Sequence, residues 1–160
     1  MTTGFTLRAA GEGDIADIMR LVRGLAAYEK LVDHFVATET DYHRELFAPG
    51  AIGRAVLAFV DGAAVGVGLW FYMLSTFVGR RRLFVEDVFV DPAHRGTGIG
   101  LGLFRHMARV ALAEGCVGME WRVLNWNQPA IDFYQRIGAK PVMDWTTQQL
   151  QGDALTALAA

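Results

Sequence analysis

Cysteine, strong net charge and long apolar runs are the features that this sequence lacks. Its one cysteine, Cys116, excludes a disulfide framework within the chain, so a reducing compartment is expected. The formal net charge of −2 provides no long-range field to attract nucleic acid. No apolar stretch reaches the roughly 18 residues that a transmembrane helix needs, and the first residues carry no basic, apolar signal segment. We therefore expect a cytoplasmic protein with no nucleic-acid or membrane partner.

What is present is an ordinary globular composition. The chain has 160 residues, of which 52% are hydrophobic and 20% are charged. That length can bury a substantial core but is too short for two full-sized domains, so we predict a single domain over residues 1–160. The histidines show no ligand spacing such as H-x-x-x-H, and no metal site is predicted.

The chain alternates between strand-like and helix-like segments. Alternating or β-rich stretches predict strands at 5–8, 55–60, 65–74, 83–90, 117–123, 140–143 and 145–150. Apolar residues at helical spacing predict helices at 14–30, 38–47, 99–112 and 129–137, with a terminal helical turn at 153–158. Asp61-Gly62 is the best hairpin signal. A hairpin followed by strand–helix–strand indicates an α/β fold with a mixed sheet and helices on both faces.

The most informative segment is the turn Arg95-Gly96-Thr97-Gly98-Ile99-Gly100, between a strand that ends at Val90 and a long helix. Glycine lets the backbone turn tightly and approach a ligand without a Cβ in the way. The start of a helix offers N–H groups without intrahelical partners and the positive end of the helix dipole. Arg95 adds a guanidinium that can bind phosphate oxygens at two points. The turn therefore predicts a phosphate site.

Three other interpretations of this turn fit less well. A P-loop needs Gly-Lys-Ser/Thr at its end, whereas Gly100 is followed here by Leu101 and Gly102. A Rossmann fingerprint needs G-x-G-x-x-G directly after a strand. Here the spacing is G-x-G-x-G in the middle of the chain, although Glu120 lies where the ribose-binding acid would be expected. A flexible glycine cap explains the turn but not the arginine at its head.

Together with other blocks, the turn resembles the GCN5-related N-acetyltransferase (GNAT) family. Its R-x-x-G-x-G pattern after Val88-Phe89-Val90 looks like the acetyl-CoA pyrophosphate loop of that family. The blocks that resemble the diamine and thialysine acetyltransferase branch are Tyr28-Glu29-Lys30, Glu86-Asp87 and Trp126-Asn127-Gln128-Pro129 leading into Phe133-Tyr134. The resemblance implies a mixed, mainly antiparallel central sheet with helices on both faces and a splay between the two central strands.

The resemblance also implies acetyl-CoA as co-substrate, with no metal. The backbone of Val88, Phe89 and Val90 is expected to pair with the pantetheine arm as an extra strand would, and Asn127 is expected to contribute an amide contact or an N-cap. The residues implied in cofactor binding are Val88, Phe89, Val90, Arg95, Gly96, Thr97, Gly98, Ile99, Gly100, Leu101, Asn127 and Tyr134.

Acylation of an amine requires removal of a proton and protonation of the leaving group. A primary amine with a pKa of about 10.4 is free in only about one molecule in 2,500 at pH 7. The resemblance implies that Glu86 binds the amine and passes on its proton, and that Tyr134 donates to the departing thiolate. The period of a strand places Glu86 and Asp87 on opposite faces. For Asp87 we favour a structural carboxylate bonded to a neighbouring backbone group or arginine.

The substrate is expected to be a small cationic amine. The residues implied in substrate binding are Tyr28, Glu29, Glu86, Glu120, Trp121 and Arg122, with Tyr28 as an aromatic wall or cation–π face. The blocks at 29–31 and 123–128 look nearer the thialysine type than the polyamine type. Asn125 stands where these relatives are expected to carry an acid, which disfavours a long polyamine. We therefore favour a lysine-like amino acid or another small primary amine such as a diamine.

Two alternatives stay open. The first is acetylation of protein lysines or of an antibiotic amine. The second is a non-catalytic acyl-CoA sensor on the same fold, which would need neither Glu86 nor Tyr134. Cys116 has no visible support as a nucleophile, so direct transfer without a covalent enzyme intermediate is expected. The resemblance further implies a homodimer, with the apolar segment 145–150 as a candidate interface.

Overall fold

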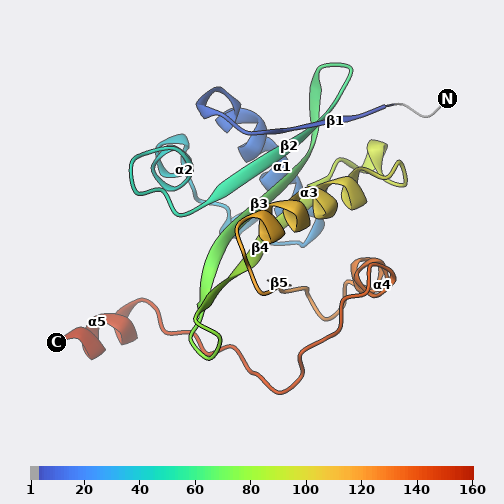
Figure 1. Cartoon of the computed structure of the whole chain (residues 1–160). Helices are drawn as coiled ribbons and strands as arrows, with labels where there is room; N and C mark the ends of the chain where they lie inside the picture. The colour runs from blue at the N-terminus through green and yellow to red at the C-terminus, as the bar shows by residue number, and fades with distance from the viewer. Residues whose placement is uncertain (1–3) are drawn as a thin grey trace. The chain divides into compact units, whose positions relative to one another are not determined.

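The computed structural model describes residues 4–160 of the chain. It divides into two compact units, the first ending at Arg122 and the second comprising Val123–Ala160. The first unit contains the sheet and the helices that cover it, and the second contains two helices joined by extended chain (Figure 1). The single domain over residues 1–160 stays a prediction.

Five strands form one sheet in the order β1-β2-β3-β4-β5. They are β1 (Thr6–Ala9), β2 (Arg54–Val60), β3 (Ala63–Ser75), β4 (Arg80–Val90) and β5 (Met119–Trp121). All neighbouring pairs are antiparallel except β4 and β5, which are parallel. The sheet is therefore mixed and mainly antiparallel, as predicted. The turn between β2 and β3 is the expected Asp61-Gly62, and both residues have positive φ, at 49° and 82°.

Helices cover both faces of this sheet, as predicted. They are α1 (Ile15–Tyr28), α2 (Glu39–Leu46) and α3 (Ile99–Ala113), with 3₁₀ turns η1 (Glu12–Asp14), η2 (Val32–His34) and η3 (Pro92–His94). α1 and α3 lie on opposite faces (Figure 1). Consecutive residues of β3 show this: a Cβ built on Gly68 would lie 3.4 Å from Met107 of α3, whereas Leu69 packs in the cluster that contains Leu21 of α1.

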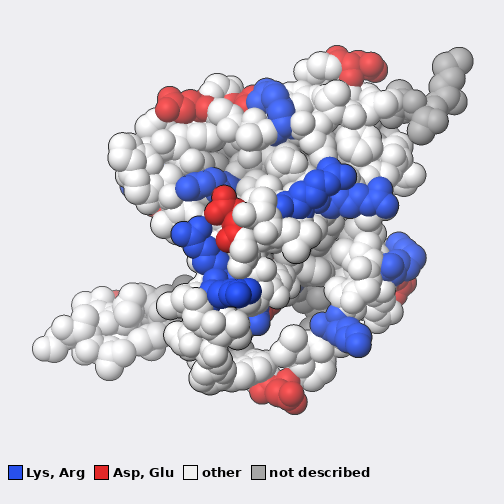
Figure 2. Space-filling view, viewed as in Figure 1, with Lys and Arg blue, Asp and Glu red and all other residues white. Residues whose placement is uncertain are grey.

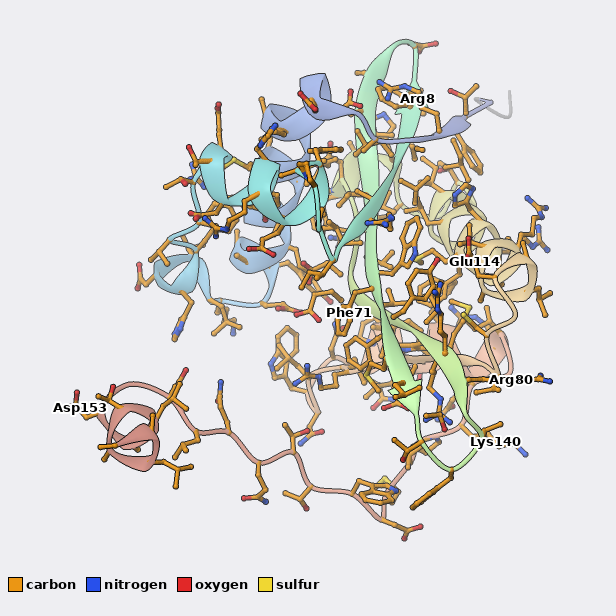
Figure 3. All side chains as sticks on the ribbon, turned by 60° about the vertical axis from the view of Figure 1, so that its left-hand side comes forward. Arg8, Phe71, Arg80, Glu114, Lys140 and Asp153 are labelled. Carbon is orange, nitrogen blue, oxygen red and sulfur yellow. The ribbon has the colours of Figure 1, made fainter. Side chains whose placement is uncertain are left out.

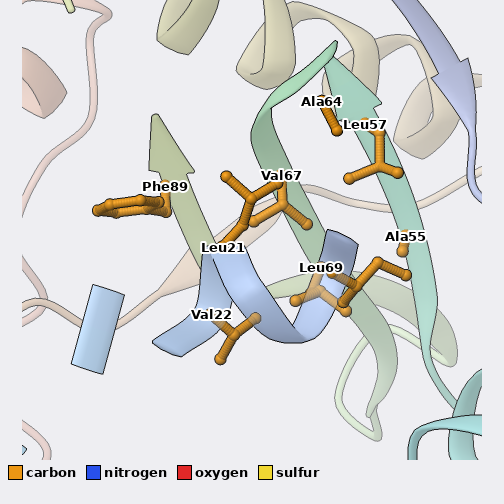
Figure 4. Packing of buried hydrophobic residues seen from close by; sticks show 9 residues of the cluster. Leu21, Val22, Ala55, Leu57, Ala64, Val67, Leu69 and Phe89 are labelled. Atoms are coloured by element: carbon orange, nitrogen blue, oxygen red, sulfur yellow. The ribbon is translucent and has the colours of Figure 1, made fainter. Parts of the chain in front are cut away.

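The apolar core beneath α1 begins with the helical periodicity of that helix. Its buried stripe of Ile18, Leu21 and Val22 meets side chains that project from β2, β3 and β4 (Figure 4). Leu57, Val67 and Phe89 supply one side chain from each strand, and none is more than 5% exposed. The face of the sheet under α1 is therefore fixed by a packed cluster.

The splay predicted between the central strands is present. β4 pairs with β5 only at Leu83, Phe84 and Val85, although β4 continues to Val90. On its other side β4 pairs with β3 as far as Val90. The ladder with β5 therefore covers only the first half of β4, and the first unit has the predicted fold class.

The strands of the first unit differ from their predicted bounds by one to three residues, and the differences at β4 and β5 have a clear cause. β4 begins at Arg80 and not at the predicted residue 83, because the hairpin pairing with β3 extends to Ser75 and Arg80, so Arg80, Arg81 and Arg82 belong to the strand. β5 spans Met119–Trp121, which is shorter than the predicted 117–123. Its length is limited by the splay, which leaves it only a short stretch of β4 as a partner.

The second unit contains α4 (Gln128–Arg136) and α5 (Asp153–Ala159), both expected. Gly138 follows α4 with φ of 91°, which is the conformation expected of a C-cap glycine. The strands predicted at 140–143 and 145–150 are wrong, because residues 139–151 form neither helix nor strand. Val142, Met143 and Trp145 are 65%, 82% and 78% exposed, so apolar alternation did not bring this segment onto a sheet edge.

Candidate active site

Glu86 occupies a β-bulge in the middle of β4. Leu69 and Trp70 are consecutive on β3, but their partners on β4 are Asp87 and Val85. Glu86 is therefore an additional residue between two paired positions, and it interrupts the alternation of side chains along β4. Period two does not govern Glu86 and Asp87, contrary to the sequence prediction, and Glu86 is exposed.

The surroundings of Asp87 strongly raise the pKa of its carboxyl group. Burial raises its pKa from 3.8 to about 7, and the negative charges of Glu86 and Glu29 add to the effect. Its partner on β3, Leu69, belongs to the apolar cluster beneath α1, which accounts for the loss of solvent. An arginine partner would lower the pKa instead. The raised pKa disfavours an arginine partner, and the structural role of Asp87 stays a prediction.

Three carboxyl groups interact electrostatically here, since the charges of Glu29 and Glu86 raise the pKa of Asp87, and together they are called the acidic cluster. Glu29 caps the C-terminal end of α1, and burial raises its pKa. Tyr42 of α2 borders the cluster, since burial and the charge of Asp87 raise its pKa to about 12. Carboxylates that are desolvated and close together favour either a shared proton or a bound cation. A primary ammonium group meets that requirement.

The sequence analysis placed Glu29 and Glu86 in the site, favoured a structural role for Asp87 and did not consider Tyr42. The available signal for Asp87 was its place in an otherwise apolar strand. The bulge that redirects Asp87 depends on pairing with β3 and leaves no pattern within residues 83–90.

Aromatic rings lie on β3 and β4 beside the acidic cluster. The rings of Phe71 and Phe84 are 5.1 Å apart between centroids. Figure 3 shows Phe71 among the side chains beside these strands. The guanidinium of Arg122 lies 5.2 Å from the centroid of Phe84. These contacts place a pair of aromatic rings, one of them buried, next to the strand positions of the cluster.

The glycine turn before α3 has an open backbone. Gly96 and Gly98 have φ of 75° and 89°, which other residues rarely adopt. Thr97 Oγ1 donates a 2.6 Å hydrogen bond to the carbonyl of His94, which fixes the turn. A Cβ built on Gly96, Gly98 or Gly100 would meet no atom of the described chain within 4 Å. With the N–H groups of the first turn of α3, this surface fits a pyrophosphate.

Arg95 is held at the head of this turn. Its Nε donates a 3.0 Å hydrogen bond to the carbonyl of Val90, the last residue of β4. Its guanidinium carbon lies 4.9 Å from the centroid of Tyr28 and 5.4 Å from that of Phe89. Tyr28, expected on the substrate side, and Arg95, expected on the cofactor side, are therefore in contact.

The predicted substrate residues of β5 are divided between the two faces of the sheet. Trp121 packs edge-on against Phe104 of α3, with centroids 5.1 Å apart. Glu120 accepts a 2.8 Å hydrogen bond from Arg82 on the neighbouring strand. The charge of Glu120 is thus offset by Arg82, and Trp121 lies on the α3 face. Their roles in substrate binding stay predictions.

The two predicted site residues of the second unit lie on and before α4. Asn127 is 7% exposed and is the N-cap of α4, where its side chain accepts a 3.4 Å hydrogen bond from Ala130 N–H. The N-cap role named from the sequence is confirmed. Tyr134 lies within α4, and its ring is 5.6 Å from that of Phe133. The pantetheine contact of Asn127 and the acid role of Tyr134 stay predictions.

Several charged side chains elsewhere form ion pairs. Arg81 contacts Glu114 at 3.4 Å and lies 5.3 Å from the ring of Tyr72, so the basic run at the start of β4 has carboxylate and aromatic partners. Acidic and basic groups are interspersed on the face in Figure 2. Within residues 4–160, no group of three or more His, Cys, Asp or Glu side chains is arranged for a metal ion. No helix in that range has both the length and the apolarity to cross a bilayer.

Comparison with known proteins identifies relatives of this chain. The model of the acetyltransferase (GNAT) family matches residues 24–139. A thialysine N-epsilon-acetyltransferase of Sus scrofa is 34% identical, covering 96% of both chains. An L-ornithine N5-acetyltransferase of Arabidopsis thaliana is 33% identical over 74% of this chain and 49% of that protein. The solved structure of an integron cassette protein from the V. cholerae mobile metagenome has a TM-score of 0.81 at 23% identity, covering 97% of both chains, and shows the same fold.

Proposed function

The chain belongs to the acetyltransferase (GNAT) family and is an N-acetyltransferase, and on this premise we propose that it transfers the acetyl group of acetyl-CoA directly to a primary amine of a small cationic substrate. The proposal joins two surfaces of the first unit. One is the open glycine turn before α3, and the other is the acidic cluster at the bulge of β4.

The acidic cluster is the observation that carries this proposal. Burial raises the pKa of Asp87 to about 7, and the nearby charges of Glu86 and Glu29 contribute. A cationic substrate would relieve this repulsion, since an ammonium group favours the ionised carboxylates. A neutral acceptor would leave the repulsion in place. The cluster therefore supports a positively charged acceptor.

The geometry of β4 supports the proposed place of acetyl-CoA. Pairing with β5 ends at Val85, and the backbone of Val88–Val90 beyond it is the proposed partner of the pantetheine arm. The residues from Arg95 to Leu101 are proposed to hold the pyrophosphate through backbone N–H groups. For Asn127 and Tyr134, which belong to the second unit, a pantetheine contact and a proton-donor role are proposed from the family resemblance alone.

The proposed chemistry needs one proton acceptor and one proton donor. Bound acetyl-CoA supplies the acetyl group as a thioester. Glu86 accepts a proton from the ammonium group, directly or through water, and the freed lone pair forms the new C–N bond as the C–S bond breaks. Tyr134 donates its phenolic proton to the departing thiolate, and the second proton that nitrogen loses as the amide forms returns the Tyr134 phenolate to its neutral form, directly or through water. Cys116 has no role in this scheme.

A lysine-like amino acid is the favoured acceptor. Relatives that resemble this chain are named for thialysine and for L-ornithine, which are amino acids with a side-chain amine. The acidic cluster and Tyr28 suit the terminal ammonium group, and Glu120, Trp121 and Arg122 are proposed to contact the rest of the substrate. Asn125 lacks the charge that a long polyamine would use.

An acceptor panel tests the proposal. The purified chain is incubated with acetyl-CoA and with thialysine, lysine, putrescine or spermidine, and release of free CoA thiol is followed. Saturable turnover with thialysine or lysine is expected, and a preference for spermidine would reverse the order of acceptors. Binding of CoA thioesters without turnover on any amine would favour the sensor alternative. Glu86→Gln should reduce turnover, whereas Glu114→Gln, the same change at the end of α3, should not.

The proposed setting is a cytoplasmic homodimer of single-domain chains that binds no nucleic acid. The exposed apolar side chains of Met143 and Trp145 support a contact with a second copy. Light scattering over a concentration series tests the oligomeric state.

A further inference from the structure

Arg95 is held between two aromatic rings that belong to different elements. Its guanidinium carbon lies 4.9 Å from the ring centroid of Tyr28, at the end of α1, and 5.4 Å from that of Phe89 on β4. Both distances are within the range of a cation–π contact. Its Nε also donates to the carbonyl of Val90 at 3.0 Å. The side chain is therefore fixed by a strand and a helix together.

The two rings are the rigid partners in this arrangement. Phe89 is 5% exposed and belongs to the core cluster, and Tyr28 packs against the same cluster. Gly24 lies four residues before Tyr28 on α1, and a Cβ built on it would come within 2.8 Å of the Phe89 ring. α1 therefore leaves space for the Phe89 ring at Gly24 and carries the Tyr28 ring at its C-terminal end. Because both rings are packed, they determine where the long side chain of Arg95 lies.

Arg95 in turn fixes the entry to the glycine turn. Its bond to Val90 closes the segment from Asp91 to His94, which joins β4 to α3. Thr97 adds the bond to His94 at 2.6 Å. The direction in which the first N–H groups of α3 point depends on this segment. The contact between Arg95 and Tyr28 therefore affects the surface that is proposed to bind phosphate.

We propose that Tyr28 is a positioning residue for the cofactor turn: its ring fixes the Arg95 guanidinium, which holds the turn in its pyrophosphate-binding conformation. The inference rests on the proposed use of acetyl-CoA. It gives Tyr28, expected at the acceptor amine, a role on the donor side as well. It also proposes that Arg95 stabilises the conformation of the turn and does not act only by attracting the phosphates through its charge.

The two roles of Arg95 make different predictions. If Arg95 acted only as a charge, Arg95→Lys would retain most of the affinity for coenzyme A, and Tyr28 would not affect that affinity. A positioning role requires the Nε–H bond and the planar group between the rings, and lysine has neither. Arg95→Lys should then weaken binding about as much as Arg95→Met.

The test measures the Kd of coenzyme A for the full chain by titration calorimetry. Tyr28→Leu should raise Kd about fivefold and Tyr28→Phe, which keeps the ring, less than about twofold. Arg95→Lys and Arg95→Met should each raise it about tenfold. Phe35→Leu is the matched control, since Arg23 lies 4.9 Å from the Phe35 ring and Phe35 packs on the same cluster. It should leave Kd unchanged.

A double variant separates positioning from a general loss of stability. In the Arg95→Met background, Tyr28→Leu should raise Kd by less than about twofold, since the contact is already absent. An unchanged Kd for Tyr28→Leu, an equal effect of Phe35→Leu, or full affinity in Arg95→Lys would each overturn the inference while leaving the proposed function intact. A wild-type chain that binds no coenzyme A would overturn both.

Discussion

Gly24 of α1 and Phe89 of β4 are packed so closely that a Cβ on the glycine would come within 2.8 Å of the aromatic ring. The ring has little room to move, because Phe89 is 5% exposed and also lies 5.4 Å from the guanidinium of Arg95. The absence of a side chain at position 24 therefore lets α1 approach the strand that carries the acidic cluster.

The first prediction is that Gly24→Ala destabilises the fold. Alanine favours a helix interior by about 1 kcal/mol relative to glycine, but overpacking a filled core costs about 1 to 3 kcal/mol. We expect a net loss of about 1 kcal/mol in the free energy of unfolding, measured with urea. Gly13→Ala is the control, since a Cβ at Gly13 would meet no described atom within 4 Å. If Gly24→Ala is as stable as wild type, the Phe89 ring moves aside without a cost in stability and the prediction is wrong.

The second prediction concerns Asp87 and the pH dependence of stability. Its pKa is raised from 3.8 to about 7, so the folded chain holds a proton that the unfolded chain has lost between about pH 4 and 7. The free energy of unfolding should therefore fall as pH rises through this window, with no further loss above it. Asp87→Asn removes the titration. The free energy of unfolding of Asp87→Asn minus that of wild type should increase by on the order of 2 to 3 kcal/mol between pH 5 and pH 8.

Urea unfolding at several pH values measures this difference. Glu29→Gln should make it smaller, because the charge of Glu29 contributes to the raised pKa of Asp87. Parallel stability curves for wild type and Asp87→Asn would contradict the prediction.

The third prediction is that the KM for a cationic amine falls as pH rises from 6 to 8. Ionised Asp87 attracts an ammonium group and protonated Asp87 does not, and a group with a pKa of about 7 changes from mostly protonated to mostly ionised over this range. If only the ionised form binds, KM should fall about tenfold. In Asp87→Asn the KM should be higher and nearly constant with pH. A wild-type KM independent of pH would exclude Asp87 from amine binding.

The sequence predicted the fold well where local pattern and pairing agree. The periodic apolar stripe predicted α1, and the Asp61-Gly62 turn predicted the hairpin of β2 and β3. The order of strands and helices indicated the mixed sheet. Prediction failed at 140–143 and 145–150, where apolar alternation exists but residues 139–151 form no strand. Alternation describes the faces of a strand, whereas a strand also needs a neighbouring edge to pair with.

The site was predicted only in part for a related reason. Glycine and arginine at the head of a helix are visible in one stretch of sequence, and the turn has the open backbone expected of it. The raised pKa of Asp87 depends on a bulge opposite Leu69 and on Glu29, 58 positions away from Asp87 in the chain. The contact of Tyr28 with Arg95 likewise joins distant segments. Such relationships are set by tertiary packing.

The fourth prediction tests Tyr134 as the proton donor. Tyr134→Phe keeps the ring and removes the hydroxyl, so kcat should fall by about 100-fold or more while the Kd of coenzyme A changes little. Tyr72→Phe is the control, because it makes the same change on β3 beside Arg81 and should leave kcat unaltered. An unchanged kcat in Tyr134→Phe would remove Tyr134 from the mechanism.

The last prediction concerns the pair formed by Arg82 and Glu120. Their side chains are 37% and 39% exposed, so the 2.8 Å contact stabilises the fold by less than about 1 kcal/mol. Its effect on the binding of a charged substrate is of similar size, since removing one partner leaves the other charge uncompensated. Arg82→Gln leaves the carboxylate and should lower the KM of a cationic amine by about two- to fivefold, whereas Glu120→Gln leaves the guanidinium and should raise it by a similar factor. The double variant should restore a value near that of wild type. Single variants that shift KM in the same direction, or not at all, would place Glu120 outside the amine site.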